Sequence, residues 1–247
     1  VNQKGGVGKT TTAVNLASFL SEEGHKTLLV DLDPQANATS GIGINKDRIT
    51  KSVYDLLVSD EIITECLYPS PFDLLNVIPS SRELAGAEVE LVNIVSRETC
   101  LASNLENLKK HYDIIIIDCP PSLGLLTLNA LVASTHSLIP LQCEYYALEG
   151  VASLLNTIKL VQENLNEKLQ ILGILLTMFD KRTALNKNIV ANAKHFFGEL
   201  LFNTVIPRNI KLAGAPSHGL PIPLYSAGST GAAAYFQFTK EVLSRVN

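Results

Sequence analysis

The chain has 247 residues, of which 46% are apolar and 18% are charged, and its formal net charge is −4. This balance argues against a disordered chain, because so much apolar sequence can bury enough surface to offset the entropy of ordering the backbone. The longest apolar run, residues 171–179, is about half as long as a membrane-spanning helix of roughly 20 residues. We expect one large α/β domain over residues 1–247.

The start of the chain and its cysteines bear on cellular location. The sequence begins at Val1 without a methionine, three residues before a lysine–glycine run, so we expect a preceding N-terminal strand and the initiator Met to be missing from it. No signal peptide precedes that run. The four cysteines include no C-x-x-C pair, which predicts reduced thiols and neither a disulfide framework nor a zinc site. These observations favour a cytoplasmic protein.

The first motif is a glycine-rich loop at residues 3–11, which leads into an amphipathic helix expected to end near Gly24. Glycines let backbone N–H groups turn inward around phosphate oxygens, and the helix directs the positive end of its dipole at the same anion. Lys9 would neutralise phosphate charge, and Thr10 would offer its hydroxyl to Mg²⁺. The predicted phosphate-binding set is Lys4, Gly5, Gly6, Val7, Gly8, Lys9, Thr10 and Thr11.

This loop departs from the usual phosphate-loop pattern. The pattern G-x-x-x-x-G-K-[ST] requires glycine at position 3, where the chain has Gln3. The chain also places a second lysine, Lys4, inside the loop. In both respects the loop resembles the deviant Walker motif of the ParA/MinD class of ATPases.

Two apolar runs beyond the loop end in carboxylates. Residues 26–33 read as a buried strand that ends in Asp31 and Asp33, and residues 113–118 read as one that ends in Asp118. The carboxyl ends of parallel strands line the crevice where nucleotides bind, so the three carboxylates can converge on the loop. A hydrophobic strand ending in Asp is the Walker B arrangement, which assigns Mg²⁺ to Asp118. Asp31 and Asp33 could instead be capping or turn residues.

The remaining pattern alternates between continuous apolar runs and helical periodicity. Such alternation is typical of an α/β fold, here a single three-layer P-loop NTPase domain with a mostly parallel, doubly wound sheet flanked by helices. The segment 44–103 has the weakest pattern. Further strands are predicted at 73–78, 136–141, 169–177 and 201–206, and helices near 83–95, 123–133, 150–164, 187–197 and 235–246.

Across almost the whole chain the motifs resemble those of Soj/ParA partition ATPases. The resemblance is carried by residues 33–37, 118–122, 144–150 and 206–209, in addition to the loop. It implies that Asp33 orients and activates the attacking water, with a place at the metal beside Thr10 and Asp118. It further implies that Asp118 opens the second switch segment and that Pro207 and Asn209 border the adenine of ATP. The catalytic set by this resemblance is Lys4, Lys9 and Asp33.

Lys4 resembles the signature lysine of this family, which reaches across an ATP-sandwiched homodimer to the partner's phosphates. Only the dimer would then supply the full positive charge around the transferring phosphoryl group. The sequence therefore favours a DNA-partition ATPase, for a chromosome or a plasmid, in which ATP binding drives dimerisation and hydrolysis resets it. By the same resemblance, turnover is weak alone and is stimulated by a centromere-bound ParB-type protein.

A role with DNA depends on local charge, because the chain as a whole is acidic. Residues 180–211 hold six Lys or Arg side chains against two acidic ones. Solvated lysines on a helix face would also explain such a count. Arg182 and Lys211, however, resemble basic positions that Soj-type proteins use to bind double-stranded DNA without sequence preference, which predicts association with the nucleoid.

Two rival functions share the deviant loop. A MinD-like ATPase would bind membranes through its last helix, but residues 235–246 offer only Lys240 and Arg245 beside Glu241, too little positive charge for a surface-binding helix. We expect that helix to pack on the core, with no membrane partner. The other rival is a cargo-positioning or metal-carrier enzyme on the same fold.

Overall fold

The computed structural model describes residues 1–58, 63–144 and 147–246. Its strands form a four-stranded sheet in the order β2-β3-β1-β4 and a two-stranded sheet of β5 and β6. All pairs are parallel except β2 with β3. The strands are β1 (Thr27–Asp31), β2 (Tyr68–Pro69), β3 (Leu75–Ile78), β4 (Ile114–Asp118), β5 (His136–Gln142) and β6 (Gln170–Thr177).

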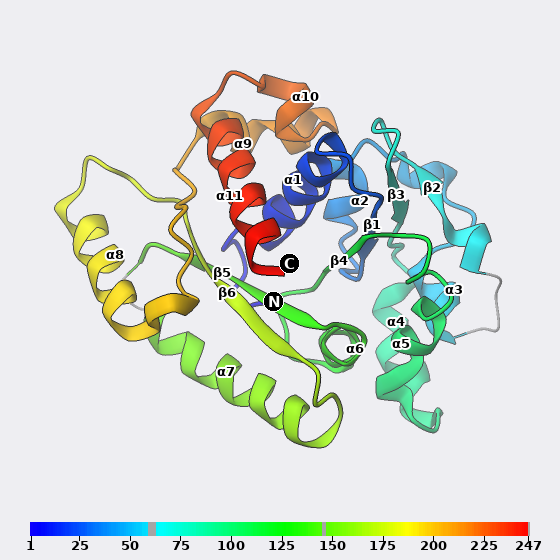
Figure 1. Ribbon diagram of the computed structural model, residues 1–247. Helices are drawn as coiled ribbons and strands as arrows, with labels where there is room; N and C mark the ends of the chain where they lie inside the picture. The colour runs from blue at the N-terminus through cyan, green and yellow to red at the C-terminus, as the bar shows by residue number, and fades with distance from the viewer. Residues whose placement is uncertain (59–62, 145–146, 247) are drawn as a thin grey trace.

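Helices cover both faces of the strands, so the fold has the three layers that the sequence predicts. Figure 1 shows α11 in front of α1 on one side, with α6 and α7 on the other. The helices are α1 (Lys9–Glu22), α2 (Asn37–Gly41), α3 (Val53–Val58), α4 (Leu84–Glu90), α5 (Cys100–Leu105), α6 (Leu125–Ala133), α7 (Ala147–Asn164), α8 (Ala184–Phe197), α9 (Ile210–Gly214), α10 (Ile222–Ser226) and α11 (Thr230–Val246).

Apolar side chains from alternate positions of the central strand fill both interlayer spaces. Leu28 and Val30 of β1 pack with α3, α4, α5 and α6, whereas Leu29 packs with α1 and α2. Every residue of β1 is buried. This is the reason that a continuous apolar run, rather than alternation, marks the strand in the sequence.

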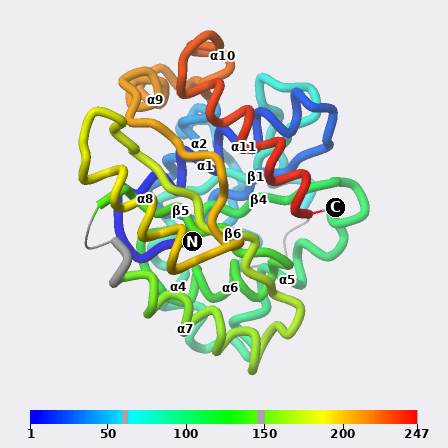
Figure 2. Tube along the Cα trace, turned by 60° about the vertical axis from the view of Figure 1, so that its left-hand side comes forward, coloured from blue at the N-terminus to red at the C-terminus, as the bar shows by residue number. Residues whose placement is uncertain are grey.

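The two sheets lie beside each other without a shared ladder among the described residues. A cavity of about 550 Å³ is lined by both β4 and β5, and Lys9 and Asp118 reach it. Val1 also lines it, and the Val1 ammonium donates a hydrogen bond of 2.7 Å to the Leu138 carbonyl of β5. The chain start lies among these strands in Figure 2. The N-terminal strand expected from the sequence stays a prediction.

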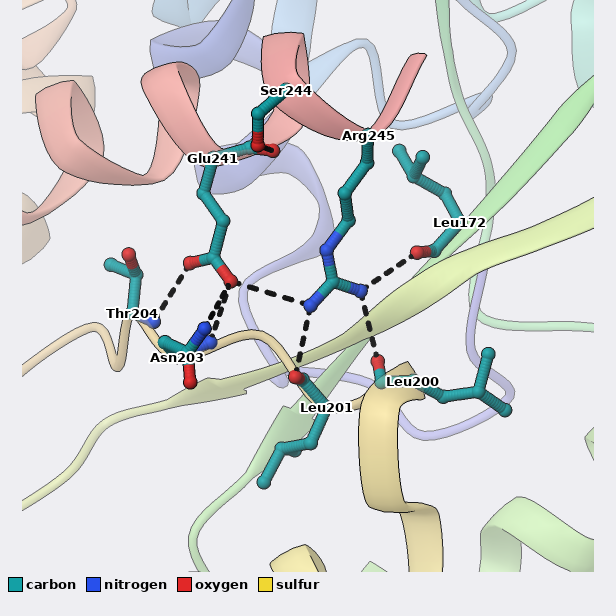
Figure 3. Close-up of polar contacts among 8 residues, drawn as sticks. All are labelled: Leu172, Leu200, Leu201, Asn203, Thr204, Glu241, Ser244 and Arg245. Atoms are coloured by element: carbon teal, nitrogen blue, oxygen red, sulfur yellow. Dashed lines mark hydrogen bonds and ion pairs between the residues drawn. The ribbon is translucent and has the colours of Figure 1, made fainter. Parts of the chain in front are cut away.

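The strand predicted at 201–206 is wrong. Leu201 forms only an isolated bridge with Ile174 of β6. Between its contacts with β6, the N–H groups of Asn203 and Thr204 donate to the Glu241 carboxylate of α11 at 2.7 and 2.9 Å (Figure 3). Phe202 and Ile206 still donate to β6, but Glu241 takes the intervening Thr204 donor that a continuous ladder would need.

The weakly patterned segment 44–103 contains short elements that the sequence analysis did not predict, including α3, β2 and α5. The predicted helix at 83–95 is also shorter, since α4 ends at Glu90 and a 3₁₀ turn follows at Leu91–Asn93. Short elements carry little periodic signal, and their burial depends on residues elsewhere in the chain.

Helix α11 packs on the core, as expected. Its apolar residues Tyr235, Phe238 and Val242 are buried in one cluster with Leu16 and Leu20 of α1. The Tyr235 hydroxyl lies 3.1 Å from the Thr12 hydroxyl, so one polar contact also joins the two helices.

Candidate nucleotide-binding site

The glycine-rich loop joins Val1 to α1 along the carboxyl edge of the strands. Gly6 and Gly8 have φ of 73° and 88°, a left-handed conformation that other residues rarely adopt. Gly8 is the N-cap of α1 and supplies no side-chain hydrogen bond to the helix start. The first N–H groups of α1 are therefore not capped by their own chain's N-cap side chain and can donate to an anion.

Contacts with β6 and β5 hold this loop in place. The Thr177 hydroxyl, at the end of β6, donates to the Val7 carbonyl at 2.8 Å. The Asn2 side chain accepts from the Lys4 N–H at 3.0 Å and donates to the Pro140 carbonyl of β5 at 2.8 Å. Sequence reasoning did not identify either residue. The place of Thr177 at the end of a predicted parallel strand was the signal that could have found it.

The two loop lysines have different surroundings. The Lys9 ammonium folds back on the loop and donates to the Lys4 carbonyl at 3.1 Å. Burial lowers the pKa of Lys9, while the nearby Asp118 charge opposes this shift. The Lys4 side chain instead points away from its own loop to the half-exposed Glu144, with 2.8 Å between Nζ and Oε2. Glu144 is a further residue of the site that was not predicted.

Asp118 lies buried at the end of β4, opposite Asp31 of β1 in the strand register. Its side chain makes a hydrogen bond with Thr10, while Oδ2 has no hydrogen-bond partner among the described residues. Burial, followed by the charge of Asp31, raises the pKa of Asp118 to about 7. An orphaned buried carboxylate oxygen beside a hydroxyl fits Mg²⁺, which prefers oxygen ligands and binds through one or two carboxylates plus substrate phosphates.

Asp31 and Asp33 have different local roles. Asp31 Oδ2 accepts hydrogen bonds of 2.7 Å from both the N–H and the hydroxyl of Thr39, and so fixes α2 to β1. Burial nevertheless raises the pKa of Asp31 to about 6. This is the structural reading that the sequence analysis left open for Asp31. Asp33 is also buried, and its carboxylate accepts from the Gln35 N–H at 2.9 Å. The predictions that Asp33 activates the attacking water and lies at the metal stay predictions.

The predicted adenine residues lie between α8 and α9 in the chain. Pro207 bridges to Phe179, which immediately precedes the loop into α8. Asn209 is the N-cap of α9, where its Oδ1 accepts from the Lys211 N–H at 2.7 Å and its Nδ2 donates to the Thr230 hydroxyl at 2.8 Å. These contacts explain Asn209 structurally, and its contact with adenine stays a prediction.

The two predicted DNA-binding residues lie on neighbouring segments. The Phe179 N–H donates to the Ile206 carbonyl at 3.0 Å, and the Arg208 N–H donates to the Phe179 carbonyl at 2.9 Å. These bonds hold the segment before α8 against the segment before α9, which lie together in Figure 2. Arg182 and Lys211 are both exposed. DNA contact itself stays a prediction.

The described residues offer neither a metal-ligand cluster nor a membrane-spanning helix. Within the described residues, no group of three or more His, Cys, Asp or Glu side chains is placed to hold a metal ion. Across that same part of the chain, every helix is too short or too polar to cross a membrane.

Comparisons with known proteins agree with this geometry. A family model described as an AAA domain matches residues 1–171. Soj, the sporulation initiation inhibitor protein of Bacillus subtilis, is 55% identical over 98% of this chain and 95% of its own length. The chromosome partitioning protein ParA of Myxococcus xanthus is 52% identical over 99% of this chain and 86% of its own.

A solved structure extends the comparison to bound ligands. The cobyrinic acid a,c-diamide synthase of Mycobacterium smegmatis, solved with an ATP analog and magnesium, has a TM-score of 0.87 and 37% identity and covers 100% of this chain and 93% of that chain. The phosphate loop, the buried Asp118 and the full-length similarity lead to one conclusion. The chain belongs to the Soj/ParA family of chromosome-partitioning ATPases.

Proposed function

We propose that this ATPase partitions DNA through a nucleotide-dependent homodimer that binds duplex DNA without sequence preference. The observation that carries the proposal is the position of Lys4. Its ammonium reaches the half-exposed Glu144 instead of its own phosphate loop, so it is presented at the surface beside the site. From there it can reach the phosphates of a second copy, and ATP would then be held between two chains.

In the proposed reaction each residue of the site has a separate task. Lys9 and the backbone N–H groups at the start of α1 bind and neutralise the β- and γ-phosphates. Thr10 and Asp118 would hold Mg²⁺, which neutralises developing phosphate charge when it is bound. Asp33 positions and polarises the attacking water. Lys4 of the second copy completes the charge around the γ-phosphate, so that turnover depends on association.

The proposed DNA surface combines Arg182 and Lys211 on their two adjacent segments. A single copy with two or three phosphate contacts would bind weakly. Dimerisation doubles the number of contacts and makes the second copy's binding intramolecular. ATP would therefore control how long the protein stays on DNA, and hydrolysis would release it.

We further propose that the protein acts in the cytoplasm, on the nucleoid, with a ParB-type protein that stimulates hydrolysis. We propose a chromosome as the cargo because similar proteins are chromosome-partitioning proteins, and a plasmid is the alternative. A MinD-like attachment of α11 to membranes receives no support from its packing, because Tyr235, Phe238 and Val242 are buried against the core.

The test is retention on a nonspecific duplex with ATP, with ADP and without nucleotide, across a salt series. The proposal expects salt-sensitive binding only with ATP. Lys9→Ala should abolish it through nucleotide binding, whereas Arg182→Glu should abolish it with dimerisation intact. Absence of DNA binding at low salt in every nucleotide state would overturn the proposal, and flotation with anionic vesicles would then test the membrane alternative.

A further inference from the structure

Arg182, one of the two exposed residues proposed to contact DNA, already pairs with a carboxylate of its own chain. The Arg182 guanidinium donates two hydrogen bonds to the Asp180 carboxylate, with Nε–Oδ1 at 2.9 Å and Nη2–Oδ2 at 2.6 Å. This two-point geometry is the one by which arginine also recognises phosphate. A carboxylate and a DNA phosphate therefore compete for the same donors.

The loop holds Asp180 in place, whereas the side chain of Arg182 is open to solvent. The Asp180 N–H donates to Asn186 Oδ1 of α8 at 2.7 Å, and the Asp180 carbonyl accepts from the Thr183 N–H at 3.2 Å. The side chain of Asp180 is 21% exposed, compared with 82% for Arg182. The carboxylate is thus fixed to the protein, whereas the guanidinium extends into solvent.

A second cation acts on the same carboxylate. Hydrogen bonds from Arg182 lower the pKa of Asp180 most, and the charge of Arg208 lowers it further. Asp180 therefore stays ionised in the basic surface, near the arginines on both segments. Its negative charge opposes the approach of DNA phosphates at the place where the positive charge is needed.

We propose that Asp180 occupies the guanidinium of Arg182 as an internal substitute for a DNA phosphate, and that DNA binding requires its displacement. This inference rests on the proposed DNA-binding function and names a residue that weakens it. The exchange of one oxyanion for another keeps the affinity of a single copy low. DNA binding would then depend on the additional contacts that a dimer provides, and release would follow readily when the dimer dissociates.

The test variant is Asp180→Asn. It removes the charge but keeps the Oδ1 acceptor that receives the Arg182 N–H at 3.0 Å, so the turn before α8 is retained. The matched control is Glu199→Gln. Glu199 is exposed in the same basic stretch, makes no ion pair among the described residues, and loses the same charge in the substitution.

Affinity for a labelled nonspecific duplex is measured with ATP across a salt series, with dimerisation followed by sedimentation. We expect Asp180→Asn to bind roughly three- to tenfold more tightly and with a steeper salt dependence, because Arg182 gains a full phosphate contact. Glu199→Gln should change affinity by less than about twofold. With Arg182→Ala already in place, Asp180→Asn should have no more effect than the control.

Several results would overturn the inference. If the wild type binds DNA and Asp180→Asn binds equally, more weakly, or only as tightly as Glu199→Gln, Asp180 does not compete for Arg182. If its effect persists in the Arg182→Ala background, the effect is general electrostatics. If neither the wild type nor Asp180→Asn binds DNA in any nucleotide state, the proposed function fails and this inference fails with it.

Discussion

Asp118 shows how a single residue can be unfavourable for the fold alone and suited to a ligand. Burial raises its pKa to about 7, and its Oδ2 has no partner among the described residues. An unpaired buried oxygen costs free energy that a hydrogen-bonded one does not. A bound cation beside Thr10 would remove this cost. Asp31, by contrast, uses its buried carboxylate to hold Thr39.

At the same scale, Asp33→Ala is expected to separate binding from hydrolysis. ATP binding should remain, because Lys9 and the loop are unchanged, whereas hydrolysis should fall by about a hundredfold or more through loss of the group that we propose to position water. Phosphate release and binding of a fluorescent ATP analogue measure the two effects. Asp47→Ala, an exposed acid beyond α2, is the control. A loss of less than about threefold in Asp33→Ala would remove Asp33 from the catalytic set.

At the scale of elements, α11 is joined to β6 and to the segment that follows α8 by a polar cluster (Figure 3). Arg245 donates to the carbonyls of Leu172 and Leu201, each at 3.0 Å, and its guanidinium lies 3.9 Å from the centre of the Phe202 ring. Glu241 accepts from the backbone of Asn203 and Thr204. The end of α11 therefore holds the backbone of residues 201–204 in place.

The same cluster predicts a pH-dependent stability. Burial alone would raise the pKa of Glu241, but hydrogen bonds from Asn203 and Thr204 and the charge of Arg245 outweigh it, so the pKa is lowered. The folded state thus favours the ionised form, whose contribution is present above the ordinary glutamate pKa and is lost as pH falls through the folded value. Glu241→Gln should lower the free energy of unfolding by about 1–3 kcal/mol near pH 7.

Urea denaturation of both proteins between pH 3 and pH 8 tests this expectation. The difference between Glu241→Gln and the wild type should shrink below about pH 4.5, where glutamate protonates. Ser244→Ala is the control, because its hydroxyl donates to the carbonyl of Glu241 within the helix. A difference that is constant across this range would show that ionisation of Glu241 does not stabilise the fold.

Gly173 of β6 allows the Phe202 ring and the Leu200 carbonyl to lie close to the backbone of β6. A Cβ on Gly173 would lie 2.6 Å from the Phe202 ring and 2.7 Å from the Leu200 carbonyl. Gly173→Ala should therefore lower the free energy of unfolding by about 2–3 kcal/mol, through displaced backbone and ring. Gly228→Ala, where nothing lies within 4 Å, should be almost neutral. Equal thermal stability of the two variants would contradict this explanation.

At the scale of the whole molecule, the site lies at an edge where the four-stranded and two-stranded sheets meet. Loop residues contact β5 through Asn2 and β6 through Thr177, while the carboxylates come from β1 and β4. Both sheets therefore contribute to the site. Lys4 and Glu144 lie at the exposed side of this edge.

Lys4→Ala is expected to prevent assembly without preventing ATP binding. Its ammonium contacts Glu144 and makes no contact with a phosphate-binding group of its own loop among the described residues, so a single copy loses little. The dimer would lose a charge at each phosphate group, and stimulated turnover with it. Sedimentation with ATP measures assembly. Lys26→Ala, at the opposite end of β1, is the control. A variant that still dimerised and kept full stimulated turnover would remove Lys4 from this role.

Much of the architecture follows from local chemistry that can be recognised in the sequence. The left-handed glycines, Lys9 and Thr10 form a phosphate loop because backbone freedom, charge and hydroxyl position are set within a few residues. The strands β1 and β4 are continuous apolar runs because helices cover both their faces. Family membership also follows from the order of these motifs.

Tertiary structure decided the features that depend on distant partners. Residues 201–206 have a strand-like sequence, yet Glu241 takes two of their N–H donors, and no local pattern contains that competition. Asp31 and Asp33 end the same apolar run in the sequence, but in the structure Asp31 binds Thr39 whereas Asp33 binds the Gln35 N–H. Lys4 and Arg182 were recognised as cations, but their partners Glu144 and Asp180 set where each charge points. Sequence determines which groups are present, whereas long-range packing determines which of them are already satisfied.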